Sequence, residues 1–175
     1  RMFAQWLIKQ GITAIILQYR MPAQHDRIPL ADAQRAMRWV RNRAENWGIN
    51  PDKVGIAGFS AGGHLASTVS THFDSGKSGT TDRLEQYSSR PDFQILFYPV
   101  ITMAPGYTHQ GSHDNLLGKD ARKKDEKLYS NDLQVTRVTP RAWIALSDDD
   151  RVVIPCNGVN YYSELYRHDV PGSLH

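Results

Sequence analysis

Four short stretches of the sequence are apolar at nearly every position, and this feature constrains the fold more than any other. They comprise residues 12–19, 54–57, 93–98 and 142–146. A strand that is apolar on both faces has to be covered on both faces, which is typical of a parallel sheet packed between helices. The connections between the stretches are long enough for parallel crossovers. The pattern therefore predicts an α/β fold with a mostly parallel sheet and helices on both faces.

Amphipathic patterns between the apolar stretches predict helices, and polar stretches predict loops. Residues 76–90 are rich in Gly, Ser and Thr, and residues 103–120 show little periodicity, so we expect both to be loops. Residues 173–175 begin a fifth strand. No repeat or linker interrupts the chain, which predicts a single domain over residues 1–175. The predicted helices are residues 1–10, 30–47, 61–72, the mixed-charge stretch 119–127, and a stripe of Val159, Tyr162, Leu165 and Tyr166 after Pro155.

Composition excludes several classes of function. The net charge is only +3, and the basic residues between 119 and 127 alternate with Asp120, Asp125 and Glu126, whereas a nucleic-acid site needs clustered, unbalanced charge. No apolar run approaches the roughly 20 residues that span a bilayer. The single cysteine, Cys156, cannot form an internal disulfide, and neither CxxC nor HExxH occurs. We therefore expect no nucleic-acid partner, no membrane span and no metal site, while the oligomeric state stays open.

The stretch GIAGFSAGGHLAS, residues 55–67, contains the pattern G-x-S-x-G around Ser60. A predicted strand precedes it and a predicted helix follows it, which is the context of a nucleophilic serine on a sharp strand-to-helix turn. Such a turn leaves no room for side chains two residues away, which would explain Gly58 and Gly62. The Ser60 hydroxyl would project at the carboxyl edge of the sheet, and the Ala61 N–H would donate to an oxyanion. The alternative is a plain glycine turn whose serine caps the helix.

Together with other stretches, this motif resembles an α/β-hydrolase, in particular the bacterial carbohydrate esterases of the acetyl xylan esterase-like and feruloyl esterase-like group. The matching stretches are QYRMP, PLADAQRAMRWVR, WGINPDKVGIAGFSAGGHLAS, LFYPV, THQGSHDNLLG and VPGSLH, which extend over nearly the whole chain. His113 departs from the family pattern, because the resemblance leads us to expect arginine there. The resemblance implies a three-layer α/β-hydrolase fold, a serine esterase without a cofactor, an acylated carbohydrate substrate such as xylan, and a secreted or periplasmic location.

In this fold the serine, the acid and the histidine follow one another in that order along the chain. The acid is therefore expected in ALSDDDRVVIPCNG, after the last long apolar stretch. Aligning Val153 and Pro155 with the family's D-x-x-V-P element selects Asp150 as the acid. Asp149 is the first alternative, and Asp148 is expected to end the strand or cap a turn. The acid would hold the tautomer of the histidine and stabilise its protonated form.

None of the seven histidines fits the role of the base. His64 lies one helical turn after Ser60 within the same helix, so we expect it to pack or to hydrogen-bond there. His175 follows the acid, but in the resembling proteins the equivalent LH belongs to a strand, and the catalytic histidine comes later in a glycine-rich loop. We therefore expect the histidine beyond residue 175, and the glycine loop with the second oxyanion N–H before residue 1.

The sequence thus predicts a serine carboxylesterase that removes acetyl or feruloyl groups from carbohydrates through a Ser-His-Asp triad and an acyl-enzyme. Residues 103–120 are expected to shape the rim that faces the sugar. Two alternatives stay open: a prolyl-oligopeptidase-like serine peptidase, which shares the G-x-S-x-G-G pattern, and a catalytically dead hydrolase scaffold used for binding. We expect the segment of 175 residues alone to be inactive or weakly active.

Overall fold

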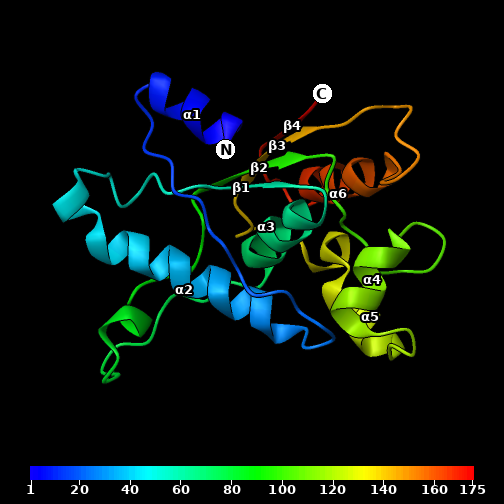
Figure 1. The fold of residues 1–175 in the computed structure, drawn as a ribbon, viewed down its shortest axis with the longest axis horizontal. Helices are drawn as coiled ribbons and strands as arrows, with labels where there is room; N and C mark the ends of the chain where they lie inside the picture. Colours follow the sequence, from blue (N-terminus) through cyan, green and yellow to red (C-terminus); the bar gives the residue numbers. More distant parts are fainter.

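A four-stranded parallel sheet forms the centre of the protein in the computed structural model, which describes residues 1–175 (Figure 1). Its strands are β1 (Ile56–Phe59), β2 (Phe93–Phe97), β3 (Arg141–Ala145) and β4 (Gly172–Leu174). They lie in chain order, and every neighbouring pair is parallel. The predicted α/β class with a parallel sheet is therefore confirmed.

Helices lie on both faces of this sheet. They are α1 (Met2–Lys9), α2 (Arg27–Arg43), α3 (Ala61–Thr71), α4 (Gln110–Leu117), α5 (Lys123–Tyr129) and α6 (Cys156–Arg167), with short 3-10 helices at Glu45–Trp47, Arg83–Gln86 and Asn131–Gln134. On one face α3 and α6 share a core with the strands, and α2 packs against α3 (Figure 1). On the other face the ring of Phe3 in α1 meets Phe59 and Phe97 edge-on. None of the helices is both long and apolar enough to cross a bilayer.

Alternation along the strands divides their side chains between the two faces of the sheet. Leu96 and Ile144 point to the face covered by α3 and α6, where they pack with Tyr161 and Leu165. All four side chains are fully buried. Trp143, which directly precedes Ile144 on β3, points to the opposite face and is 36% exposed. The main core therefore lies between the sheet and the α3–α6 layer.

The prediction of a strand at residues 12–19 is wrong. This segment pairs with no strand of the sheet. Its apolar side chains are largely exposed, and Ile16 has 63% of its surface accessible. Tyr19, at its end, packs against the core that α2 and α3 share. Apolar, β-branched side chains give a segment the propensity for a strand, but a strand forms only where another strand accepts and donates the backbone hydrogen bonds.

The stretch 103–120, predicted as a loop, contains the helix α4. Its N-cap is His109, whose Nδ1 accepts a hydrogen bond from the N–H of Ser112 at 3.2 Å. Histidine is not among the residues that usually cap helices, so the sequence pattern lacks the ordinary signal for a helix start. The mixed-charge helix predicted at residues 119–127 is present as α5, but it begins only at Lys123.

The last predicted helix is confirmed as α6, but its buried face differs from the predicted stripe. Leu165 is buried as predicted, whereas Val159 and Tyr166 are 41% and 77% exposed. Gly158 lies against the sheet, and a Cβ at that position would come within 2.6 Å of the Leu146 side chain. A small residue therefore sets how closely α6 approaches the strands.

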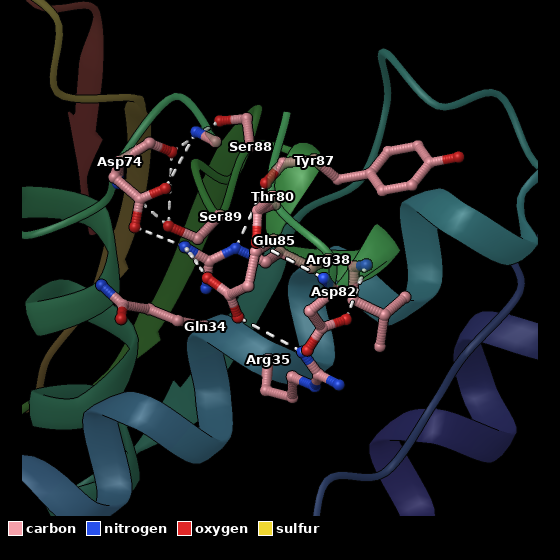
Figure 2. Close-up of polar contacts among 12 residues, drawn as sticks. Gln34, Arg35, Arg38, Asp74, Thr80, Asp82, Glu85, Tyr87, Ser88 and Ser89 are labelled. Atoms are coloured by element: carbon pink, nitrogen blue, oxygen red, sulfur yellow. Dashed lines mark hydrogen bonds and ion pairs between the residues drawn. The ribbon is translucent and has the colours of Figure 1, made fainter. Parts of the chain in front are cut away.

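The polar face of α2 holds the segment that follows α3 (Figure 2). The Arg38 side chain is 6% exposed, and its guanidinium donates to the Asp74 carboxylate and to the carbonyl of Tyr87. Arg35, one turn earlier, donates to Asp82 at 2.5 Å. Partial burial would raise the pKa of Asp74, but the hydrogen bonds that it accepts, chiefly from Arg38, hold that pKa below its ordinary value. The predicted polar loop, residues 76–90, therefore contains the short 3-10 helix Arg83–Gln86 and is held to α2 through Asp82 and Tyr87.

Replacing Arg38 with alanine is expected to release this segment, because the carboxylate of Asp74 and the carbonyl of Tyr87 lose their partner. We expect the free energy of unfolding to fall by about 2 kcal/mol, the worth of a hydrogen bond to a charged group and less than the loss on breaking a fully buried ion pair, because the side chain of Asp74 is 45% exposed. Arg35→Ala is the matched control: its side chain is 46% exposed, so the loss should stay below about 1 kcal/mol. Denaturant unfolding of the full-length protein measures both, and equal losses would contradict the role given to Arg38.

Candidate active site

The turn at Ser60 has the strained geometry expected of a nucleophile between a strand and a helix. Ser60 lies between β1 and α3 with φ 52° and ψ −120°, where residues other than glycine are rarely found. Its N–H donates to the carbonyl of Phe97 at 3.1 Å, and its carbonyl accepts from the N–H of Val100 at 3.1 Å. The hydroxyl does not cap α3. Helix capping, the usual task of a serine at this position, therefore does not explain the residue.

Glycines make the turn possible, but not at both positions that the motif indicates. A Cβ on Gly58 would lie 2.1 Å from the carbonyl oxygen of Gly62. A Cβ on Gly63 would lie 2.7 Å from the Cβ of Pro99. A Cβ on Gly62 itself would meet no atom within 4 Å. The steric explanation therefore holds for Gly58, is wrong for Gly62, and applies to Gly63 in its place.

Ala61 begins α3 directly after Ser60. As the first residue of the helix, it has no carbonyl four residues earlier in the helix to accept its N–H. The residue is exposed, and the positive end of the helix dipole lies at this point. The Ala61 N–H is therefore available to an oxygen that becomes negative beside Ser60.

The loop after β3 anchors one of its three aspartates. Oδ1 of Asp150 accepts hydrogen bonds from the N–H groups of Val153 at 3.0 Å and Val152 at 2.8 Å. These two bonds, with a smaller contribution from His109, lower the pKa of Asp150 below its ordinary value. Because only Oδ1 is engaged, Oδ2 is available to accept from a histidine. Asp149 accepts only from the hydroxyl of the serine two residues before it, so its loop holds it less firmly.

Strand register brings the Ser60 turn and the Asp150 loop to the same edge of the sheet. Phe59 pairs with Phe97, and Phe97 pairs with Ala145, so β1, β2 and β3 reach the same level there. Ser60 follows directly, and Asp150 follows within a short loop. The ends of β1 and β3 lie two strand spacings apart, roughly 10 Å. An imidazole ring fits within that separation of the two strand ends.

Two histidines near this edge have structural roles. His64 is buried, and its Nε2–H donates to the carbonyl of Tyr129 at 2.8 Å. Burial lowers the pKa of His64 to about 4. His175 extends the pairing of β4 with β3, and its ring stacks on Trp143 with centroids 5.3 Å apart. His64 is therefore a packing residue, and His175 a strand residue, as the sequence predicts.

A cavity of about 230 Å³ lies beside the Ser60 turn. One wall is the first turns of α3, from Ala61 to Thr68, and the facing wall includes His109 and Ser112 at the start of α4. Tyr129 lies in the lining, where burial and the nearby Asp26 raise its pKa. No group of His, Cys, Asp and Glu side chains, here or elsewhere, is arranged to hold a metal ion. The sequence does not indicate this cavity, because its lining residues come from segments far apart in the chain.

Asn157, in the first turn of α6, joins the acid loop to the segment after β2. Its Oδ1 accepts from the N–H groups of Ile101 at 2.9 Å and Thr102 at 3.2 Å. Its Nδ2 donates to the carbonyls of Tyr107 at 2.9 Å and Ile154 at 3.2 Å. The side chain is buried and fully hydrogen-bonded, so it fixes the loop that carries the acid. The only signal in the sequence is an asparagine among apolar residues in a helical first turn.

A parallel sheet between helices, with a strained serine between a strand and a helix at its carboxyl edge, defines the α/β-hydrolase fold. The chain superposes on the crystal structure of an acetyl ester-xyloside bifunctional hydrolase from Caldicellulosiruptor lactoaceticus with a TM-score of 0.97 and 40% identity, covering 100% of this chain and 64% of that one. A truncated form of a carbohydrate esterase from gut microbiota gives a TM-score of 0.80 at 25% identity, covering 96% of this chain and 66% of that one.

The family model BD-FAE matches residues 1–165, and the chain belongs to this family. An acetylxylan esterase from Xylanibacter ruminicola is 43% identical over 167 residues, which are 93% of this chain and 32% of the esterase. Endo-1,4-beta-xylanase B from Butyrivibrio fibrisolvens is 34% identical over 166 residues, 93% of this chain and 26% of the xylanase. The predicted resemblance to carbohydrate esterases is confirmed, and the chain spans about a third or less of these two relatives.

Replacing Gly58 with alanine is expected to disrupt the turn, because the new Cβ would strike the backbone carbonyl of Gly62, which cannot move without breaking the first turn of α3. We expect the free energy of unfolding to fall by at least about 3 kcal/mol. Gly62→Ala is the matched control in the same turn. Its Cβ meets open space, and alanine favours a helix, so stability should stay within about 0.5 kcal/mol or rise. Thermal unfolding followed by circular dichroism compares the two, and a similar fall in both would refute the steric explanation.

Proposed function

We propose that the protein to which this chain belongs is a serine carboxylesterase that hydrolyses acyl esters of carbohydrates. The observation that carries this proposal is the backbone strain at Ser60, whose hydroxyl makes no cap hydrogen bond to α3. Ser60 lies at the same sheet edge as the anchored carboxylate of Asp150. Membership of the BD-FAE family and the names of the relatives support a xylan-type sugar as the alcohol part of the ester. Acetyl is the favoured acyl group, and feruloyl is the second candidate.

In the proposed reaction, Oγ of Ser60 attacks the carbonyl carbon of the ester while a histidine, acting as general base, takes the hydroxyl proton. The oxyanion that forms accepts a hydrogen bond from the N–H of Ala61. The histidine returns the proton to the oxygen of the departing sugar, which leaves an acyl ester on Ser60. Water, activated by the same histidine, hydrolyses this ester and restores the serine.

Asp150 has the orienting role in this proposal. Its free Oδ2 would accept from Nδ1–H of the histidine, which keeps Nε2 unprotonated and facing Ser60. Of the two histidines that follow Asp150, His168 ends α6 and His175 pairs with β3 and stacks on Trp143, so we expect the catalytic histidine beyond residue 175. Because the pKa of Asp150 is lowered, its carboxylate stays ionised as the pH falls into the ordinary range of aspartate. The acid limb of the pH–rate profile should therefore report the histidine and not Asp150.

Ser60→Ala in the full-length protein tests the nucleophile. We expect the release of acetate from acetylated xylan and of p-nitrophenol from p-nitrophenyl acetate to fall by about 10⁵-fold or more, since no other group forms the acyl-enzyme. Ser163→Ala, on the exposed face of α6, serves as the control and should retain full activity. Normal turnover by the Ser60 variant would eliminate the assignment. Cleavage of dipeptidyl amides by the unaltered protein, without ester hydrolysis, would instead favour a peptidase.

Asp150→Asn tests the acid with little disturbance of the loop, because the amide oxygen still accepts from Val152 and Val153. Loss of the charge should lower kcat/KM by about 10³- to 10⁴-fold on both esters, as expected when the histidine loses its orienting carboxylate. Asp149→Asn is the matched control and should change kcat/KM by less than about threefold. The reverse result would transfer the role of the acid to Asp149.

A further inference from the structure

His109 has a defined tautomer, and no step of the proposed reaction uses this residue. Its Nδ1 lies 3.2 Å from the backbone nitrogen of Ser112 and 2.9 Å from its Oγ. A backbone N–H can only donate, so Nδ1 is the acceptor. In the neutral imidazole the proton is therefore on Nε2.

This tautomer is not the one that the catalytic base of a triad needs, so His109 does not fit that role. A triad histidine donates from Nδ1 to the acid and takes the serine proton on an unprotonated Nε2. In His109 both assignments are reversed, because Nδ1 accepts from the N–H of Ser112 in the first turn of α4 and Nε2 carries the proton. The ring is therefore a hydrogen-bond donor fixed in place by the helix that it caps.

The Nε2–H of His109 is free, and the residue lines the cavity beside the Ser60 turn. Nε2 of His109 has no hydrogen-bond partner within the protein, whereas Nδ1 is fully engaged. The ring lines the same cavity as Ala61, the residue next to Ser60. It also lies within electrostatic reach of Asp150, whose pKa it helps to lower. His109 therefore lies near both segments that would carry out the reaction, the Ser60 turn and the Asp150 loop.

We propose that His109 is a specificity-determining residue that donates from Nε2–H to an oxygen of the sugar in the ester substrate. This inference rests on the proposed function. The carbonyl oxygen of the acyl group has its own donor in the Ala61 N–H, and an acetyl group has no further acceptor away from the reacting bond. The remaining acceptors are the hydroxyl and ring oxygens of the sugar. A donor on the α4 side of the cavity would therefore recognise the alcohol part of the ester.

His109→Asn tests this role with the cap preserved, because asparagine is a good N-cap but is too short to replace Nε2. We expect kcat/KM for acetylated xylo-oligosaccharides to fall about tenfold, mainly through a higher KM, as for the loss of one hydrogen bond made in both ground and transition states. The value for p-nitrophenyl acetate, which has no sugar, should stay within about twofold. Gln110→Ala is the control: its amide donates to Asp114 at 2.6 Å outside the cavity, so both substrates should be unaffected.

A binding measurement tests the role of His109 independently of the proposed catalytic function. Calorimetry with an acetylated xylo-oligosaccharide should show about tenfold weaker binding to the Ser60→Ala, His109→Asn double variant than to the Ser60→Ala single variant. This comparison needs no turnover, so it decides the role of His109 even if the Ser60 variant keeps its activity and the proposed nucleophile fails. Equal affinity of the two variants, or an equal fall of kcat/KM on both esters in His109→Asn, would overturn the inference.

Discussion

The register of three parallel strands determines where chemistry can take place in this protein. Phe59, Phe97 and Ala145 are paired at one level, so the segments that follow β1, β2 and β3 all start from a common edge. The backbone of Ser60 is bonded on one side to Phe97 and on the other to Val100. The strained turn therefore keeps its geometry because β2 and the segment directly after it hold both of its peptide groups. A shift of β2 by one residue would move the serine and the acid loop out of alignment.

Much of the fold could be predicted from the sequence, because the decisive forces there are local or are averaged over a whole segment. Strands buried on both faces need apolar residues at nearly every position, and residues 93–98 have them at all positions but Gln94. Residues 12–19 have the same pattern but no pairing partner in the structure, and a pairing partner is not a local property. The start of α4 was missed for another reason: His109 caps it with an imidazole nitrogen, a use of histidine that composition does not signal.

The candidate site divides in the same way. Ser60 could be proposed as the nucleophile because its motif follows from the geometry of one turn. Asp150 could be proposed as the acid because its loop resembles the family's D-x-x-V-P element. The sequence could not show that Gly63, and not Gly62, is the sterically crowded glycine. The side chain that crowds Gly63 is Pro99, which comes from the end of another strand. The cavity and the bridging role of Asn157 depend likewise on segments that meet only after folding. Prediction therefore ends where a residue's environment is made by distant parts of the chain.

His113, where the resemblance indicates arginine, links two helices beside the candidate site. The side chain is 6% exposed and lies between two carboxylates, with Nδ1 3.0 Å from Asp114 and Nε2 3.2 Å from Glu126. Each ring nitrogen faces one carboxylate, so His113 joins α4, which carries Asp114, to α5, which carries Glu126. The link holds α4 near its beginning, one turn after the capping His109. The proposed sugar-binding donor, Nε2–H of His109, is therefore held in place in two ways. The Nδ1 of His109 accepts from the first turn of α4, and His113 links α4 to α5.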